Sequence, residues 1–323
     1  TLAAEQHTVL CLDEMEASPP QWMPTLAPAA PACLLYTSGT TGIPKGVVLS
    51  HSAILARAAR YAADYGINQA DRLSLLQSFA VSAGIREIYG ALLTGATLTF
   101  YDVRTRGLGE LAQWLNHAGI TVFYAVPTIF RLFLETLRVV RLGGEPVREY
   151  EVSGFRRHFK RSCVLANGYA ATETDTICQM LIDHDTRIVA GRVPAGAPVP
   201  GVEVTLRDER GDPATGAVGE IRVAGMMLAS GYWDAGSGQV QPFDLPIATG
   251  DLGYQLDDGR VFLVGRRDLI VNVHGYRIHL GEIERAVSRV PGVVEAVAAP
   301  RPTAQGDTTI AVYYVAEGES EPD

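Results

Sequence analysis

The sequence predicts an α/β protein in which mostly parallel sheets carry helices on both faces and adjoin a smaller antiparallel part. Between about residues 32 and 142, short apolar strand-like runs alternate with segments of helical apolar spacing. This alternation is typical of a parallel sheet covered by helices. Beyond Pro198, short strands separated by turn residues replace the helices, which is typical of antiparallel hairpins.

The N-terminal region is predicted to be an irregular arm followed by a strand and a phosphate-type loop. Five prolines within residues 17–31 prevent a regular element, and a strand is expected over 32–36. The next turn combines hydroxyls, glycines and one lysine, which favours phosphate binding at the carboxyl edge of the open sheet. Pro44 before the lysine and Gly46 after it exclude a Walker A loop. The loop residues are Ser38, Gly39, Thr40, Thr41, Gly42 and Lys45.

The following segment is expected to form the α/β part. Ser50 can cap a helix whose apolar stripe ends near Gly66. Strands are predicted at 73–76, 97–101, 120–126 and 139–142, and helices near 108–115 and from Pro127 to Leu137.

The C-terminal third is predicted to form two further units. A small barrel-like subdomain of antiparallel strands includes a hairpin turn at Asp257-Asp258-Gly259. A small α+β unit then contains a hairpin around His274-Gly275, a helix over about 281–290, and strands near 293–298 and 309–315. The expected domains are therefore the arm 1–31, the α/β part 32–197, the β-rich part 198–267 and a partial C-terminal unit 268–323.

Composition excludes several classes of function. The 36 acidic against 27 basic residues give a net charge of −9 without a basic block, which makes nucleic acid an unfavourable partner. The four cysteines lack metal or disulfide spacing, and the apolar runs are shorter than the roughly 18 residues that a membrane helix needs. We expect a cytoplasmic protein with no membrane partner. The start at Thr1 suggests a trimmed segment.

Five motifs follow one another in a fixed order. They run from Tyr36 to Gly46, Asn167 to Thr174, Gly219 to Trp233, Thr249 to Leu252, and Gly265 to Glu284. Together they closely resemble the motifs of the adenylate-forming superfamily, which includes acyl-CoA synthetases, firefly luciferases and the adenylation domains of nonribosomal peptide synthetases. The synthetase adenylation domains are closest in motif style. Each motif alone would also fit an ordinary surface turn, so the resemblance depends on all five.

This resemblance implies an ATP-dependent ligase that joins a carboxylate to the α-phosphate of ATP, giving an acyl-adenylate and pyrophosphate. Its implied catalytic residues are Thr172, Glu173 and Arg266, with Glu173 also holding Mg²⁺. The loop from Ser38 to Lys45 would hold the β- and γ-phosphates. The other implied roles are adenine binding by Asn167, Gly168 and Tyr169, ribose binding by Asp251, and a hinge at Asp268 that makes the C-terminal domain mobile.

The segment after the strand at 73–76 predicts the substrate class. Relatives that activate α-amino acids carry an Asp directly after a Phe there, whereas Ala80 follows Phe79 in this chain. Burying an unpaired ammonium group costs more free energy than one methylene group contributes to binding, which is roughly 1–3 kcal/mol. We therefore expect a carboxylic acid without an α-amine. The expected pocket positions are Phe79, Ala80, Val81, Gly84, Tyr124, Val140, Leu142, Gly168, Thr176 and Ile177.

The resemblance leaves the acyl acceptor and the activity open. The phosphopantetheine thiol of a carrier protein is favoured, because standalone coenzyme A ligases of this family often carry Pro where this chain has Gly281. An acyl-CoA ligase and a truncated, inactive scaffold domain are the alternatives. The family also places a catalytic lysine near the end of its C-terminal domain, yet no Lys or Arg follows Arg301. We expect this stretch alone to bind ATP weakly and to adenylate slowly.

Overall fold

The structure is a computed structural model, and it describes residues 25–37, 44–127, 136–188, 193–273, 276–302 and 308–316. The expected arm, the centre of the phosphate loop from Ser38 to Gly42 and the turn at His274-Gly275 lie outside these residues, at least in part. So does most of the helix predicted from Pro127 to Leu137.

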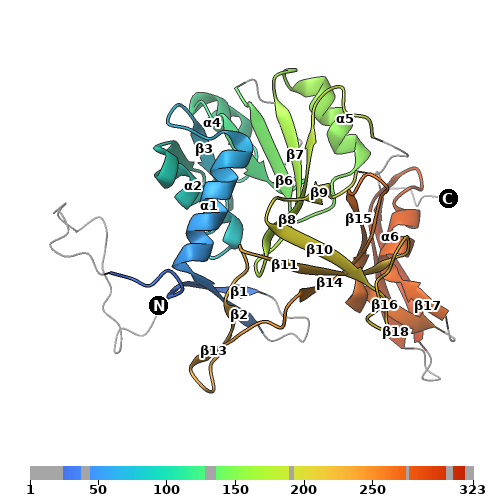
Figure 1. Ribbon diagram of the computed structural model, residues 1–323. Helices are drawn as coiled ribbons and strands as arrows, with labels where there is room; N and C mark the ends of the chain where they lie inside the picture. The colour runs from blue at the N-terminus through green and yellow to red at the C-terminus, as the bar shows by residue number, and fades with distance from the viewer. Residues whose placement is uncertain are drawn as a thin grey trace.

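The central sheet has the strand order β4-β3-β5-β6-β7-β8-β9. Its strands from β4 to β7 are parallel neighbours, whereas β8 and β9 join antiparallel at one edge. The predicted mostly parallel sheet is confirmed (Figure 1). The bounds are β3 (Arg72–Leu75), β4 (Thr97–Phe100), β5 (Val122–Ala125), β6 (Val139–Gly143), β7 (Val164–Ala171), β8 (Asp175–Ile182) and β9 (Ala197–Pro198).

Helix α1 begins and ends where the sequence predicts. The Ser50 hydroxyl accepts a hydrogen bond from the Ala53 N–H at 3.2 Å, and Gly66 ends the helix in the left-handed region at φ 57°. The helices α2 and α5 were not predicted. The bounds are α1 (His51–Tyr65), α2 (Ser82–Thr94), α3 (Val103–Arg106), α4 (Leu111–His117) and α5 (Glu149–His158).

The helices cover both faces of the central sheet, because successive strand residues point to opposite sides. Phe123 and Val140 pack in the core under α4 and α5, whereas Val122 and Val139 pack in the core under α1 and α2. Figure 1 shows α1 and α5 on opposite sides of the sheet. The side chains of the middle strands are therefore nearly all buried, and a polar one there needs a partner.

Two antiparallel sheets replace the predicted barrel-like subdomain. One has the order β10-β11-β14-β15, and the other joins β12 and β13 to β2 and β1, at the opposite end of the sequence. Both are open sheets, so the expectation of barrel-like closure is wrong. The bounds are β1 (Pro31–Thr37), β2 (Lys45–Ser50), β10 (Val202–Arg207), β11 (Gly219–Gly225), β12 (Gly231–Asp234), β13 (Gln239–Gln241), β14 (Ile247–Gln255) and β15 (Val261–Arg266).

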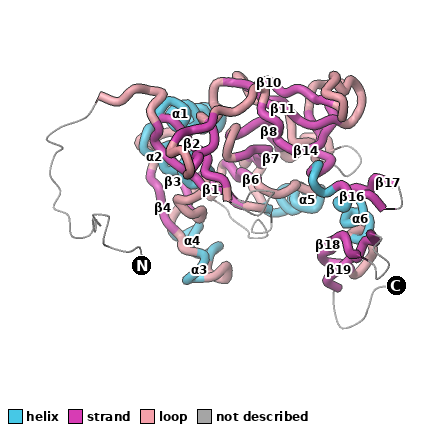
Figure 2. The backbone as a smooth tube through the Cα atoms, turned by 90° about the horizontal axis from the view of Figure 1, so that it is seen from below, coloured by secondary structure: helices cyan, strands magenta, loops and turns pink. Residues whose placement is uncertain are grey.

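The C-terminal residues form a small lobe set apart from the central sheet in Figure 2. Here α6 packs against a β18-β19 hairpin, as the predicted α+β unit requires. No helix among the described residues is both long and apolar enough to cross a membrane. The bounds are η3 (Arg267–Leu269), β16 (Ile270–Val273), β17 (Tyr276–His279), α6 (Leu280–Val287), β18 (Val293–Pro302) and β19 (Thr308–Ala316).

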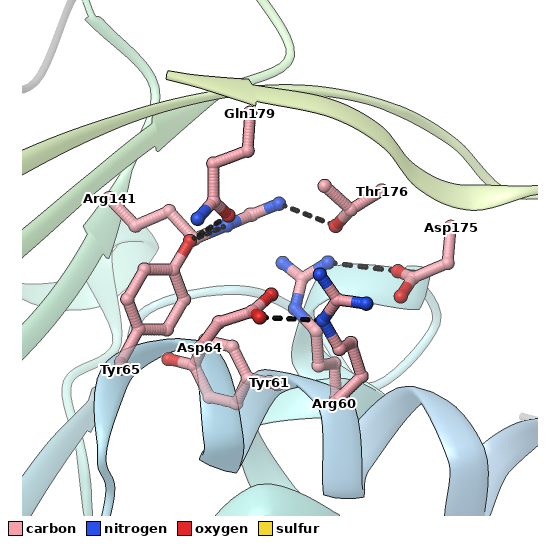
Figure 3. Close-up of a pocket in the computed structure, with 9 residues that line it drawn as sticks. Arg60, Tyr61, Asp64, Tyr65, Arg141, Asp175, Thr176 and Gln179 are labelled. Carbon is pink, nitrogen blue, oxygen red and sulfur yellow. Dashed lines mark hydrogen bonds and ion pairs between the residues drawn. The ribbon is translucent and has the colours of Figure 1, made fainter. Parts of the chain in front are cut away.

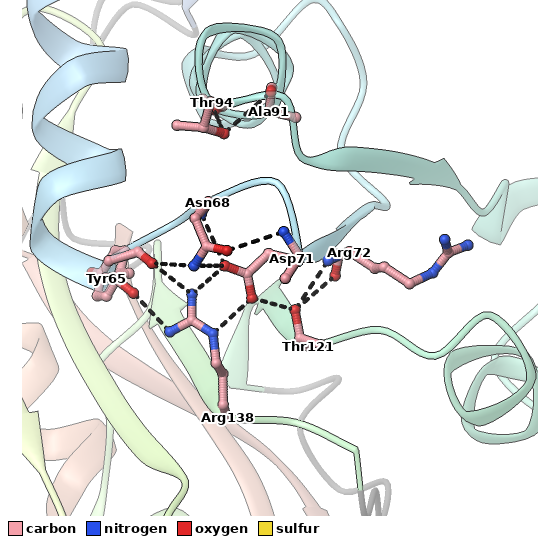
Figure 4. A network of polar contacts seen from close by, with 11 residues as sticks. Tyr65, Asn68, Asp71, Arg72, Ala91, Thr94, Thr121 and Arg138 are labelled. Atoms are coloured by element: carbon pink, nitrogen blue, oxygen red, sulfur yellow. Dashed lines mark hydrogen bonds and ion pairs between the residues drawn. The ribbon is translucent and has the colours of Figure 1, made fainter.

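A polar network fastens α1 to the strands at the start of the sheet (Figure 4). Arg138 donates to both carboxylate oxygens of Asp71, at 2.7 and 2.6 Å, and to the Tyr65 carbonyl at the end of α1. The Thr121 hydroxyl donates to the same carboxylate at 2.8 Å. Although burial acts to raise the pKa of Asp71, these hydrogen bonds hold it below its ordinary value. The network thus fixes the position of α1 over β3, β5 and β6.

A glycine in α2 allows the close approach of a neighbouring backbone. A Cβ added at Gly84 would lie 2.5 Å from the Ser78 carbonyl oxygen, whereas a Cβ at the helical Gly154 of α5 would meet nothing within 4 Å. We expect Gly84→Ala to lower the free energy of unfolding by about 1–3 kcal/mol. Gly154→Ala should instead raise it by about 0.5–1 kcal/mol, since alanine favours the helix. Urea unfolding of both variants checks this, and equal effects would contradict the described packing of α2.

Candidate active site

The second sequence motif forms the tip of the β7-β8 hairpin. Ala171 pairs with Asp175, so Thr172, Glu173 and Thr174 make a three-residue turn. Such turns place the residue that follows them in the left-handed region, and Asp175 occupies it at φ 57°. Aspartate tolerates this conformation better than most residues. The turn presents Thr172 and Glu173 at the tip, while the side chain of Asp175 is buried.

A buried arginine on α1 holds the hairpin tip from behind. Arg57 donates to the carbonyl oxygens of Thr172 at 3.1 Å, Glu173 at 3.2 Å and Met227 at 2.9 Å. It is only 3% exposed. A guanidinium group can satisfy several fixed acceptors at once, so Arg57 positions the tip relative to the loop that leads to β12.

The first motif reaches the same tip through an antiparallel hairpin. Lys45 opens β2 and pairs with Thr37 at the end of β1, so the loop between them connects antiparallel strands. The loop therefore follows a strand of a separate antiparallel sheet and not a strand of the parallel sheet. The Lys45 Nζ lies 5.2 Å from the centre of the Tyr232 ring, and the Tyr232 hydroxyl donates to Glu173 Oε1 at 3.0 Å. Lys45 and Glu173 are thus brought together around Tyr232.

A second polar group lies along β7, β14 and β15. The Tyr169 hydroxyl donates to Asp251 Oδ2 at 2.5 Å, and Arg266 Nη1 lies 3.6 Å from Asp251 Oδ1. Burial, followed by the charge of Asp251, raises the pKa of Tyr169, so its hydroxyl stays a donor. The structure therefore brings the expected adenine and ribose residues into contact. Asn167 is buried and donates to the Pro194 carbonyl at 2.8 Å.

A cavity of about 160 Å³ opens beside the hairpin tip. Its lining comes from the start of α2, the ends of β5 and β6, and the β7-β8 hairpin. The lining residues are Val81, Ser82, Ala83, Arg86, Tyr124, Arg141, Gly143, Gly144, Gly168, Ala170, Ala171, Thr172 and Asp175. Among the expected pocket residues, Val81, Tyr124 and Gly168 are in this set.

Two of the expected pocket positions, on the chain before α2, lie outside this cavity lining. The expected alignment treats Phe79 as the end of a strand, but Phe79 and Ala80 form an exposed turn between β3 and α2. The Phe79 ring packs on Phe100, with ring centres 5.2 Å apart. Ser82 and Arg86, one helical turn apart, line the cavity instead. Gly84 points to the Ser78 backbone.

On β6, the cavity is lined by the residues next to the expected pocket positions. Val140 and Leu142 are fully buried on the face of β6 that packs under α4 and α5, so Arg141 and Gly143 face the cavity. Ile177 packs in the core between β8 and the β10-β11 sheet. Thr176 accepts a hydrogen bond from Arg141 at 3.0 Å. The cavity lining therefore includes three charged residues, Arg86, Arg141 and Asp175.

Figure 3 shows a smaller neighbouring pocket, where Arg141, Thr176 and Asp175 lie close together. Arg86 Nη1 donates to Asp175 Oδ1 at 3.0 Å, with both side chains at most 5% exposed. Arg141 donates through Nε to the Tyr65 hydroxyl, which in turn donates to Gln179 at 2.7 Å. Burial acts to raise the pKa of Asp175, but Arg86, Arg57 and Arg141 hold it below its ordinary value. Asp175 is therefore ionised at neutral pH.

The donor set of the site fits a magnesium ion held together with phosphate. Among the described residues, no three His, Cys, Asp or Glu side chains are grouped to hold a metal ion. Mg²⁺ is usually held by one or two carboxylates and by substrate phosphates, rather than by an all-protein cage. The half-buried Glu173 supplies one carboxylate at the hairpin tip, next to Lys45. The side chain of Asp268, the expected hinge, lies outside the described part of the chain.

Sequence reasoning missed the arginines, although a signal was present. Arg57 falls within the apolar stripe of α1, between Ile54 and Tyr61, at a position that helical spacing buries. Arg141 lies in the otherwise apolar strand β6. A charged residue on a buried face needs a partner, which marks such positions as candidates for a site.

The comparisons with known proteins agree with this geometry. A family model for AMP-binding enzymes matches residues 3–233. The fold and the grouped motif residues are those of an adenylate-forming enzyme. The chain belongs to the AMP-binding enzyme family.

Relatives at about one-third identity are carrier-loading and peptide-synthetase proteins. The chain is 32% identical over 289 residues to an L-proline--[L-prolyl-carrier protein] ligase of Streptomyces coelicolor, covering 85% of this chain and 54% of that protein. It is 32% identical over 311 residues to tyrocidine synthase 2 of Brevibacillus parabrevis, covering 91% of this chain and 8% of that protein. The chain thus spans about half of the prolyl ligase.

Solved structures share the fold at lower identity. The Bacillus subtilis O-succinylbenzoate coenzyme A synthetase in complex with ATP and magnesium ion has a TM-score of 0.80 and 23% identity, covering 95% of this chain and 65% of that chain. ATP-bound MatB from Rhodopseudomonas palustris has a TM-score of 0.76 and 24% identity, covering 92% and 60% respectively.

Glu87, next to the cavity arginine on α2, should make stability depend on pH. Burial raises its pKa to about 8, although Arg86 and Arg141 act in the opposite direction. The folded protein then keeps the proton while an unfolded glutamate, near 4.5, releases it. Stability from this group is complete below about pH 4.5 and is lost as the pH rises to about 8.

We therefore expect Glu87→Gln to gain stability relative to the wild type as the pH rises from 5 to 8. Urea unfolding of both proteins at several pH values measures this difference, in which the other titrating groups cancel. Parallel profiles of the two proteins would show that Glu87 ionises normally in the folded state.

Proposed function

We propose that this chain activates a carboxylic acid with ATP. A carboxylate oxygen attacks the α-phosphorus, a P–O bond to pyrophosphate breaks, and an acyl-adenylate forms. The observation that carries this proposal is the position of the hairpin tip. Thr172 lines the acid-sized cavity, while Glu173 at the same tip lies with Lys45 around Tyr232.

The protein's part in this reaction is positioning and electrostatics. Tyr169, Asp251 and Arg266 would hold the adenosine. Arg57 would hold Thr172 and Glu173 in position relative to the bound acid. The Lys45 charge and the loop before it would bind the β- and γ-phosphates. Mg²⁺, held by Glu173 and phosphate oxygens, would offset the negative charge at the reacting phosphorus.

An acid without an α-amine remains the proposed substrate class. This class is supported by the charges that line the cavity, and not by Ala80. The charged residues that line the cavity are Arg86, Arg141 and Asp175, so positive charge exceeds negative charge there. An ammonium group would have to displace Arg86 from Asp175 or stay unpaired, and a like charge in a desolvated site is unfavourable. The prolyl-carrier relative acts on an amino acid by its name, so this point needs its own test.

The proposed acceptor of the acyl group is the phosphopantetheine thiol of a carrier protein. A prolyl-carrier ligase and a peptide synthetase are among the relatives at about one-third identity, which favours a carrier. Transfer to coenzyme A is the alternative. Acyl transfer from the adenylate to an isolated carrier protein or to coenzyme A, followed by mass spectrometry, distinguishes the two.

Two matched variants test the proposed magnesium site. Glu173→Gln keeps an acceptor for the Tyr232 hydroxyl but removes the charge, whereas Tyr232→Phe removes that hydrogen bond but keeps the carboxylate. We expect Glu173→Gln to weaken ATP binding with Mg²⁺ by about tenfold or more, with little effect in EDTA, since a contact with a charged group is worth about 1.5–3 kcal/mol. Tyr232→Phe should have a smaller effect.

Titration calorimetry with and without Mg²⁺ measures the ATP affinity of each variant, and its melting temperature checks that the variant is folded. If Glu173→Gln binds Mg²⁺ and ATP as the wild type does, the metal assignment is wrong. If the wild type shows no ATP binding at all, the proposed function fails for this chain.

A further inference from the structure

The cavity arginine Arg86 has more donors than the protein uses. Its Nη1 donates to Asp175, but Nε and Nη2 are buried and have no hydrogen-bond acceptor among the described residues. Arg86 is 5% exposed and lines the cavity. Buried donors without a partner are costly, which indicates that an acceptor belongs there when the site is filled.

The surrounding charge favours an anion as that acceptor. The charged side chains of the described cavity lining are Arg86, Arg141 and Asp175. Glu87, also near Arg86, keeps its proton at neutral pH because of burial. Two guanidinium groups and one carboxylate thus line the cavity, and a further negative charge would be attracted.

The rest of the lining holds Arg86 and Arg141 in place. The Arg86 guanidinium carbon lies 5.3 Å from the Tyr61 ring centre and 5.4 Å from that of Tyr124, and Arg141 lies 5.0 Å from the Tyr124 ring. A Cβ at Gly168 would approach Arg141 Nη2 to 2.9 Å, so a larger residue there would displace this guanidinium group. A fixed planar guanidinium group suits two-pronged binding of a carboxylate.

We infer that the acid activated at this site carries a second carboxylate, bound by Arg86 while the reacting carboxyl lies at Thr172. This inference rests on the proposed function and names its substrate class as short dicarboxylic acids. The cavity of about 160 Å³ is close to the roughly 150 Å³ cavity that holds a benzene molecule, so the acid is small.

Matched pairs of acids test the inference on the wild-type chain. The melting temperature is measured at rising concentrations of succinate against butyrate, and of glutarate against pentanoate, with and without Mg²⁺ and ATP. We expect the diacid of each pair to reach its half-maximal shift at an about tenfold lower concentration or less. Equal shifts within each pair, or no shift with either diacid, would overturn the inference.

Three variants assign the preference to Arg86. Arg86→Gln should abolish the preference for the diacid, and the double variant Arg86→Gln with Asp175→Asn does the same without leaving a buried unpaired carboxylate. Arg60→Gln removes the same charge from α1, where Arg60 pairs with Asp64 outside the cavity lining, and should keep the preference. Persistence of the preference in the double variant would overturn the inference.

The two proposals fail in different ways. A wild-type chain that binds Mg²⁺ and ATP but treats diacids and monoacids alike contradicts only the second carboxylate. A chain that shows no shift with Mg²⁺ and ATP contradicts the proposed function itself.

Discussion

The buried charge of Asp175 is the constraint on which the site depends. Its carboxylate lies directly after the turn of the β7-β8 hairpin, and Arg86 on α2 pairs with it while Arg57 on α1 and Arg141 on β6 add to its stabilisation. A buried carboxylate needs such partners, because its desolvation would otherwise cost several kcal/mol. Arg57 also holds the hairpin tip, and Arg86 and Arg141 line the cavity. One carboxylate thereby joins α1, α2 and the central sheet into a single site.

The arrangement also explains how distant segments meet at one place. Residues Gly231–Asp234 form β12, which pairs with β2, and this pairing brings Tyr232 to Lys45 and to Glu173. Asp251 on β14 reaches Tyr169 on β7 in the same way. The two open antiparallel sheets therefore place single side chains, Tyr232 and Asp251, against the β7-β8 hairpin. The geometry of the site therefore depends on which strands these sheets bring together, more than on the packing within each sheet.

Much of the fold could be predicted from local patterns. The cap at Ser50, the left-handed Gly66 and the apolar runs of β3, β5 and β6 depend on residues close in sequence, so their bounds were predicted within a few residues. Helix α2 could not be predicted in this way, because it carries Arg86, Glu87 and two glycines on its buried side. The barrel-like closure failed because strand pairing between β2 and β12 is a long-range choice.

The sequence by itself determined the family, the motif residues and the chemistry they resemble, because motifs depend on residue type and order. Only the tertiary structure decided which face of β6 lines the cavity and which residues start α2. A shift of one position on a strand turns every side chain to the opposite face, and here it exchanges the apolar Val140 and Leu142 for Arg141 and Gly143. The charge of the cavity follows from that register, and no local pattern fixes it.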